Sequence, residues 1–176
     1  YLEFKMFKVA LIECGAGNIK SMENALLRAE FNPVLVSNAI ELKTVDVDLI
    51  VLPGVGAFGY VMEQLRHKGL IEELERKVLD CKVPFLGVCV GMQILAKTAL
   101  EHGEHKGLGW LEGTVNKIQI NSDERLPHVG WNCLEPIEGK FLEKFAGQDF
   151  YFVHSNAIMC LEEDVAARST YGNTFV

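Results

Sequence analysis

Short apolar runs alternate with amphipathic segments along the first half of the chain. Residues 7–12 and 34–36 are runs rich in β-branched residues, which predict strands. Residues 48–52 and 84–88 are continuous apolar runs, the pattern of strands that are buried on both faces of a sheet. These four runs are the predicted strands of a central sheet.

Two helices are predicted between these strands. Within residues 18–30, apolar residues recur at the i, i+3, i+4, i+7 spacing from Met22 to Ala29, which gives a helix one apolar face. A further helix is predicted over residues 70–80. Strands that alternate with helices predict an α/β fold with a mostly parallel sheet flanked by helices. In such sheets, functional sites gather at the carboxyl ends of the strands.

The second half of the chain is richer in strands, which are predicted over residues 114–120 and 150–153. We find no internal repeat, low-complexity tract or Pro/Gly-rich linker. We therefore expect one domain over residues 6–176, with Met6 as the natural start and residues 1–5 as a remnant of cloning.

The composition narrows the class of protein. The chain has 176 residues, 49% of them hydrophobic and 23% charged, which suits one folded domain. A net charge of −7 argues against nucleic acid as a partner. No apolar run reaches the roughly 18 residues that span a bilayer, and no signal peptide is recognisable. The five cysteines are odd in number and lack metal-site spacing, so we expect a cytoplasmic protein without a metal ion or cofactor.

The strongest candidate for chemistry is Cys89, which lies in the sequence Gly-Val-Cys-Val-Gly over residues 87–91. This motif joins a predicted strand to a helix predicted over residues 92–96, the context of a nucleophile elbow. The helix N-terminus would favour the reactive thiolate, and the amide of Val90 is free to hold an oxyanion. The alternative is a buried structural thiol. The two flanking glycines favour catalysis. The remaining cysteines are interpreted as packing or surface thiols: Cys14, Cys81, Cys133 and Cys160.

A second glycine-rich turn, Pro53–Gly56, ends another predicted strand. Glycines after a strand let backbone amides face a phosphate or a developing oxyanion. A plain tight turn is the alternative, but proximity to the strand that carries Cys89 favours an oxyanion hole. A third such segment, Gly15–Asn18, is not predicted to bind a dinucleotide, because Lys20 occupies the position of the third glycine.

Five motifs follow one another along the chain: Pro53–Gly56, Gly87–Gln93, Gly107–Gly109, His128–Asn132 and Tyr151–Ser155. In their order and spacing, they resemble those of the glutaminase subunits of imidazole glycerol phosphate synthase, which are class I (triad) glutamine amidotransferases of histidine biosynthesis. The resemblance runs from about Lys8 to the last residue. It implies a flavodoxin-like fold that lacks its C-terminal strand and helix.

The resemblance implies a reaction and a partner. Cys89 would attack the side-chain amide of glutamine, release ammonia and leave a glutamyl thioester that water hydrolyses. The partner is a (β/α)₈-barrel cyclase, which receives the ammonia within a heterodimer and makes imidazole glycerol phosphate and AICAR. The residues assigned by resemblance are Val55, Gly56 and Val90 for the oxyanion hole, Gln93, Glu101, His154 and Ser155 for glutamine, and Asn18, Trp131 and Asn132 for the cyclase.

Each assignment has a plainer alternative. Gln93 could be a solvated helix residue, Glu101 a surface acid, and Trp131 an ordinary core residue. The role of His128 is left open. Three histidines in charged surroundings are interpreted as solvated: His67, His102 and His105.

The chain also departs from the family's pattern. A catalytic triad needs a histidine base and a glutamate, which the family carries in a Phe-His-Pro-Glu segment that would follow Val176. We expect the sequence to be incomplete at this end. Cys14 and Asn156 stand where the family has aromatic residues. Such changes would suit a paralogue that supplies ammonia for sugar amidination in polysaccharide synthesis, and the missing base would suit a non-catalytic subunit that stabilises its partner.

Overall fold

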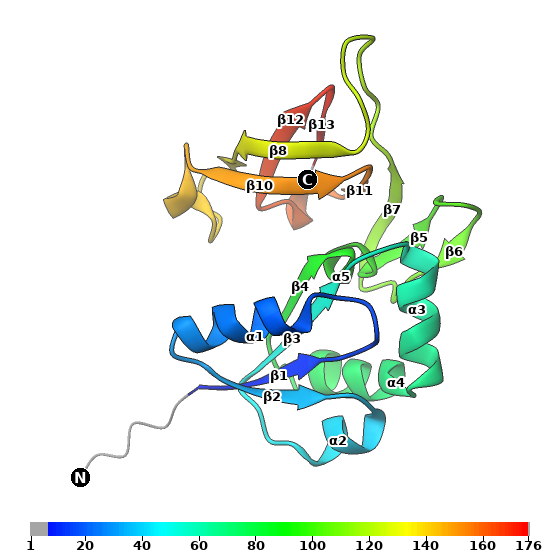
Figure 1. Ribbon diagram of the computed structural model, residues 1–176, viewed down its shortest axis with the longest axis vertical. Coiled ribbons are helices and arrows are strands. Elements are labelled where there is room, and N and C mark those ends of the chain that lie inside the picture. The colour runs from blue at the N-terminus through cyan, green and yellow to red at the C-terminus, as the bar shows by residue number, and fades with distance from the viewer. Residues whose placement is uncertain (1–6, 176) are drawn as a thin grey trace. The chain divides into compact units, whose positions relative to one another are not determined.

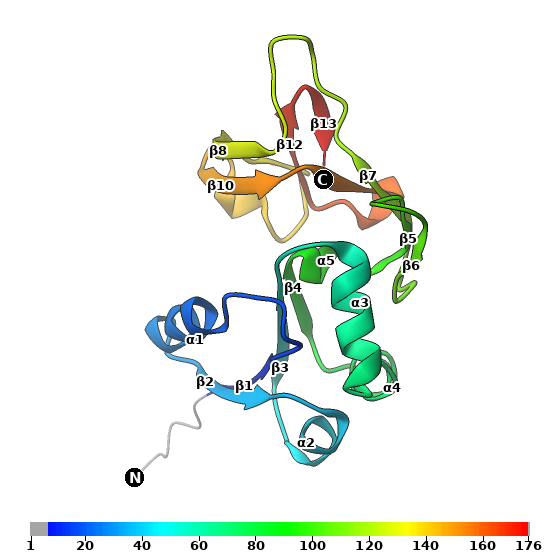
Figure 2. The ribbon, with the colours of Figure 1, turned by 45° about the vertical axis from the view of Figure 1, so that its right-hand side comes forward.

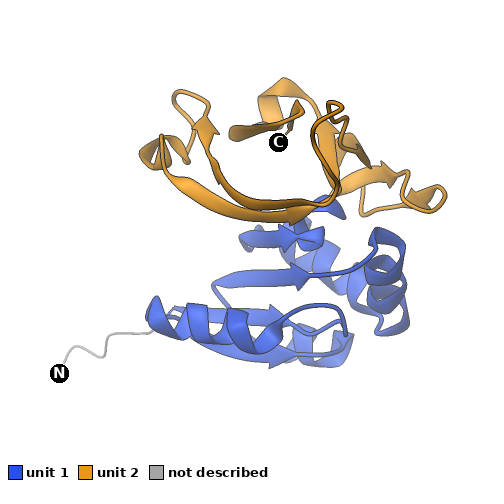
Figure 3. Ribbon diagram, turned by 45° about the horizontal axis from the view of Figure 1, so that its top comes forward, with its two compact units in different colours: residues 1–94 blue, residues 95–176 orange. Residues whose placement is uncertain are grey.

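The computed structural model describes residues 7–175. The predicted start at Met6, the preceding residues 1–5 and Val176 lie outside the described residues. The chain divides after Ile94 into two compact units, residues 1–94 (unit 1) and residues 95–176 (unit 2) (Figure 3). No separate linker joins the two units: the last helix of unit 1 ends at Gln93, and the first strand of unit 2 begins at Ala96.

Unit 1 is a four-stranded, wholly parallel sheet in the order β2-β1-β3-β4, with helices on both faces (Figures 1 and 2). The four predicted strands are confirmed, as are the helices predicted over residues 18–30 and 70–80. The strands are β1 (Lys8–Ile12), β2 (Asn32–Val36), β3 (Leu49–Gly54) and β4 (Phe85–Cys89). The helices are α1 (Ile19–Arg28), α2 (Ala39–Thr44), α3 (Phe58–His67), α4 (Leu70–Glu75), which continues as the π-helical turn η1 (Arg76–Asp80), and α5 (Val90–Gln93).

The core of unit 1 follows from the alternation of side chains along its strands. Val9 and Leu11 of β1 pack with Leu26 of α1 on one face of the sheet. The central strand β3 is buried along almost its whole length, as its apolar run predicted. Helix α3 was not predicted, although the residues it buries, Phe58, Val61, Met62 and Leu65, recur at the helical spacing.

Strand β4 is not buried on both faces, so that expectation was wrong. Leu86 is 48% exposed, because β4 is the edge strand of the sheet among residues 7–175. The helix expected over residues 92–96 is also corrected: α5 ends at Gln93, and Ala96 begins strand β5. Ala96 pairs with Leu111 and is fully buried, so sheet pairing outweighs the weak stability of an isolated short helix.

Unit 2 is built from short strands in three small sheets, ordered β11-β7-β5-β6, β10-β8 and β13-β12-β9. Among the residues that the structure describes, all its pairings are antiparallel except β5 with β7. Ile118, Ala157 and Phe175 form a small core. The strands are β5 (Ala96–Ala99), β6 (His105–Lys106), β7 (Leu111–Lys117), β8 (His128–Cys133), β9 (Glu135–Pro136), β10 (Asp149–His154), β11 (Asn156–Cys160), β12 (Ala167–Tyr171) and β13 (Asn173–Phe175), with 3₁₀ turns η2 (Glu143–Phe145) and η3 (Glu162–Asp164).

Candidate functional site

Cys89 occupies a sharp turn between β4 and α5. Its φ of 55° and ψ of −119° are rarely adopted by a residue with a side chain, so the backbone is strained there. A Cβ atom on Gly87 would collide with the carbonyl of Gly91, and one on Gly91 would collide with the carbonyl of Leu52. Only glycine therefore fits on either side of Cys89, which is the elbow geometry that the sequence predicted.

The thiol of Cys89 is not activated by its surroundings within unit 1. The residue is exposed as a whole, yet burial around the sulfur raises the pKa of the Cys89 thiol above its ordinary value. A hydrogen bond with the backbone of Val90 lowers this pKa, but by less. The first residue of α5 thus favours the thiolate as expected, but burial around the sulfur outweighs this effect. Attack by this sulfur requires a base that takes its proton.

The turn Pro53–Gly56 lies directly beside Cys89. Strands β3 and β4 are parallel neighbours, and Gly54 is paired in register with Cys89. After Gly54, Val55 is exposed and Gly56 adopts a φ of 94°. The structure thus brings together the backbone segments that the sequence assigned to one oxyanion hole, with Val90 following Cys89 in α5.

Gln93, the last residue of α5, is only 7% exposed. The alternative of a solvated surface glutamine is therefore wrong. The short helix places this buried amide one turn after Cys89.

In unit 2, hydrogen bonds through Asn156 connect Glu101 with His154. The side-chain amide of Asn156 donates to Glu101 Oε1 at 2.7 Å, and the Asn156 carbonyl lies 3.1 Å from His154 Nδ1. Ser155 lies between His154 and Asn156, and its carbonyl accepts a hydrogen bond from the Ile118 amide. Two residues assigned to glutamine binding, Glu101 and His154, are thus joined by Asn156, which departs from the family's pattern.

His128 and His154 form a hydrogen-bonded pair, with 3.1 Å between Nδ1 of His128 and Nε2 of His154. Burial lowers the pKa of both imidazoles, which favours their neutral forms. Because the Asn156 carbonyl can only accept, His154 carries its proton on Nδ1, and its Nε2 accepts from His128. The ring of His128 stacks on Tyr171 with 4.0 Å between centroids. His128 is therefore a core histidine.

Trp131 is 72% exposed, so the alternative of an ordinary core residue is wrong. It contacts Tyr151 edge to face across β8 and β10, and the neighbouring pair Val129 and Val153 is also exposed. We call these four residues the β8–β10 apolar face. Asn132 is the next residue of β8, so its side chain points to the opposite side, where it donates to the Thr170 carbonyl at 2.7 Å.

Asn18, the other residue assigned to the partner, is exposed at the start of α1 in unit 1. Its side-chain oxygen accepts a hydrogen bond from the Ser21 amide at 3.2 Å, which caps the helix. This cap fixes the β1–α1 loop.

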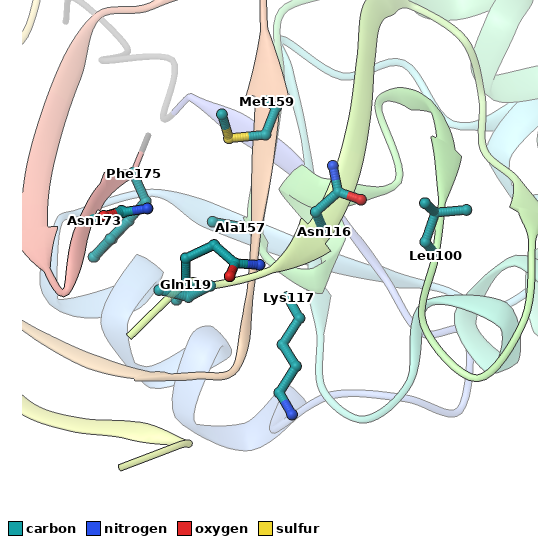
Figure 4. Close-up of a pocket in the computed structure, with 9 residues that line it drawn as sticks. Leu100, Asn116, Lys117, Gln119, Ala157, Met159, Asn173 and Phe175 are labelled. Carbon is teal, nitrogen blue, oxygen red and sulfur yellow. The ribbon is translucent and has the colours of Figure 1, made fainter. Parts of the chain in front are cut away.

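Unit 2 also contains a pocket of about 420 Å³ that the sequence analysis did not foresee (Figure 4). Its walls come from β7, β11 and β13, which are distant in sequence, so no local motif announces it. The pocket is lined by Leu100, Asn116, Lys117, Ile118, Gln119, Ala157, Met159, Asn173 and Phe175.

In residues 7–175, no group of three His, Cys, Asp or Glu side chains could hold a metal ion. Within the same range, every helix is too short or too polar to cross a membrane.

Comparison with known proteins gives concordant results. A profile of the family described as Glutamine amidotransferase class-I matches residues 10–171. Imidazole glycerol phosphate synthase subunit HisH 1 of Campylobacter jejuni subsp. jejuni is 38% identical, over 96% of this chain and 84% of the relative. Subunit HisH of Aquifex aeolicus is 41% identical, over 96% of this chain and 81% of the relative.

Solved structures agree on the fold. A crystal structure of a glutamine amidotransferase superposes with a TM-score of 0.70 at 20% identity, over 94% of this chain and 86% of the other. The structure of PurLQS from Thermotoga maritima gives a TM-score of 0.69 at 20% identity, over 96% of this chain and 78% of the other. At this identity, the likeness concerns the fold alone.

Proposed function

The chain belongs to the class-I glutamine amidotransferase family, and we propose that it is the glutaminase subunit of an imidazole glycerol phosphate synthase. The observation that carries the proposal is the glycine-flanked elbow, which holds Cys89 beside the Pro53–Gly56 turn. The family match over residues 10–171 runs through both units, which supports one amidotransferase domain. The five cysteines are free thiols, which fits a reducing cytoplasm.

In the proposed reaction, the sulfur of Cys89 attacks the side-chain amide carbon of glutamine. The amides of Val90 and Val55, together with Gly56, stabilise the negative charge that develops on the amide oxygen. Collapse of the tetrahedral intermediate releases ammonia and leaves a glutamyl thioester, which water then cleaves to glutamate. Because burial raises the pKa of the Cys89 thiol, attack requires a base. In the family, this base is a histidine that a glutamate orients.

We assign four residues to the substrate glutamine: Gln93, Glu101, His154 and Ser155. Glu101 supplies a carboxylate that suits the α-ammonium group, and the hydrogen bond from Asn156 holds that carboxylate in place. Both ring nitrogens of His154 are hydrogen bonded within the protein, so we assign His154 to the wall of the glutamine site and not to the catalytic base.

We assign the cyclase contact to the β8–β10 apolar face and to Asn18. An exposed tryptophan paired with a tyrosine is typical of the anchor of a protein interface. Asn132 fastens β8 to Thr170, so we interpret it as a residue that supports this face from behind.

Ammonia release from the complete natural chain tests the proposal, measured with glutamine in the presence and absence of the cyclase. We expect the cyclase to raise the rate, and we expect Cys89→Ala to lower it by roughly 10³-fold or more because the nucleophile is lost. Cys81→Ala, which removes an exposed cysteine of unit 1, serves as the matched control and keeps the rate.

A Cys89→Ala variant that still hydrolyses glutamine would contradict the nucleophile assignment. Equal rates with and without the cyclase would contradict the coupling. Growth without histidine in a strain that lacks its own glutaminase subunit separates this function from sugar amidination, because a paralogue for another acceptor would not restore growth.

A further inference from the structure

Glycines from two other segments of unit 1 approach the backbone of Pro53 and Gly54. A Cβ atom on Gly17, in the β1–α1 loop, would lie 3.2 Å from the Pro53 carbonyl oxygen and 3.4 Å from Cβ and Cγ of the Pro53 ring. A Cβ atom on Gly54 would lie 2.5 Å from the amide nitrogen of Gly91. A side chain on Gly54 would collide with the backbone of Gly91, and one on Gly17 would press against Pro53 and have to displace it slightly. The Pro53–Gly54 segment is therefore closely packed against both neighbouring segments.

The second half of the same turn is open. A Cβ atom on Gly56 would have no neighbour within 4 Å, and Val55 is 52% exposed. The turn therefore has a packed first half, Pro53–Gly54, and an unpacked second half, Val55–Gly56.

The position of Pro53–Gly54 matters because of the register between β3 and β4. Pro53 is paired with Val88, and Gly54 with Cys89. The amide of Val55 belongs to the peptide group that directly follows Gly54. A shift of Pro53–Gly54 is thus passed straight to the N–H group assigned to the oxyanion hole.

The β1–α1 loop is itself held in place. Asn18 follows Gly17, and its side chain caps α1 through the Ser21 amide. Gly17 adopts a φ of 153°, which side chains rarely permit. The loop is therefore an anchored support for Pro53.

We propose that Gly17 is a positioning residue of the glutaminase reaction. Because it has no side chain, the anchored loop rests against Pro53 and fixes the Gly54–Val55 peptide group relative to Cys89. Gly17 touches no substrate and acts only through Pro53. The inference rests on the proposed function and adds a residue to it.

The test compares Gly17→Ala with Gly15→Ala in the complete chain bound to its cyclase. Both glycines lie in one loop at positive φ, but a Cβ on Gly15 would make only an ordinary contact, 3.5 Å from Gln64 Oε1. We expect Gly17→Ala to lower kcat by roughly 10- to 100-fold with KM for glutamine nearly unchanged, since small displacements at a reacting centre are costly. Gly15→Ala should keep kcat within about threefold of the wild type, because it shares the backbone strain but not the contact.

Alkylation of Cys89 by iodoacetamide gives the second readout, because it needs the thiol but not the oxyanion hole. Its rate should be unchanged in both variants. If Gly17→Ala fails to fold, Pro53→Ala tests the same contact from the other side, because it removes the ring atom Cγ and adds no bulk. Its kcat should fall by a smaller factor, with alkylation unchanged.

Three results would overturn the inference: equal loss of kcat in both glycine variants, a kcat that Gly17→Ala and Pro53→Ala leave unchanged, or an alkylation rate that falls in parallel with kcat. In each of these the wild-type complex is active, and only the role of Gly17 fails. A wild-type complex that releases no ammonia would instead overturn the proposed function, and this inference with it.

Discussion

The two units hold their candidate residues by different means. In unit 1, the position of Cys89 is set by backbone packing, in which the absence of side chains at Gly87 and Gly91 is the essential feature. In unit 2, Glu101 and His154 are held by hydrogen bonds between side chains and to the backbone of Asn156. The turn that holds Cys89 in unit 1 therefore tolerates no added atom at its glycines, whereas the positions of Glu101 and His154 in unit 2 depend on particular polar groups.

The largest effect is expected from crowding the elbow in unit 1. Gly91→Ala places a methyl group against the carbonyl of Leu52, and we expect it to lower the free energy of unfolding by about 3 kcal/mol. Gly103→Ala is the control, since its φ is 119° but a Cβ there meets nothing within 4 Å; it should cost about 1 kcal/mol from backbone strain alone. Urea unfolding of both variants measures the difference. Equal costs would show that steric crowding does not define the elbow.

A smaller effect is expected from removing the polar link in unit 2. Asn156→Ala deprives Glu101 of a charge-assisted hydrogen bond, so KM for glutamine should rise roughly tenfold with kcat nearly unchanged. Asn116→Ala, another partly buried asparagine, on the neighbouring strand β7, should leave KM unchanged. Steady-state kinetics of the complex checks both. If Asn156→Ala leaves KM unaffected, Glu101 does not need the hydrogen bond from Asn156, and the contrast drawn between the two units fails.

The last effect concerns the dependence of stability on pH. Burial lowers the pKa of His128 and His154, so below about pH 6.5 the unfolded chain takes up protons that the folded chain does not. The contribution of the two neutral histidines to the free energy of unfolding is fully present above this pH. It falls as the pH drops toward the pKa values of the folded state, by at most about 1.4 kcal/mol per pH unit for each histidine. Thermal unfolding between pH 8 and 5 measures this loss.

Two variants assign the pH dependence to its source. His128→Phe keeps an aromatic ring on Tyr171 but removes one titrating group, and should flatten the dependence. His67→Gln removes an exposed histidine of α3 and should leave the dependence unchanged. A pH dependence that His128→Phe leaves as steep as in the wild type would show that His128 does not contribute to it.

Most of the fold of unit 1 could be predicted from the sequence. The strands of unit 1 were predicted nearly to the residue, since a parallel sheet covered by helices needs continuous apolar runs that are visible locally. The edge position of β4 could not be predicted, because an apolar run does not tell which neighbours its strand has. Nor could the end of α5, since Ala96 pairs with the distant Leu111.

The sequence by itself determined the elbow and the glycine turn beside it. Both are short runs of consecutive residues, and the glycines that they need can be read directly from the sequence. It also determined the family, through motifs in a fixed order. The tertiary structure alone decided that burial raises the pKa of the Cys89 thiol, that Asn156 joins Glu101 to His154, and that Gly17 lies close to Pro53. These depend on contacts between residues far apart in the chain, and the energies of such contacts come from distance and burial, which no local pattern contains.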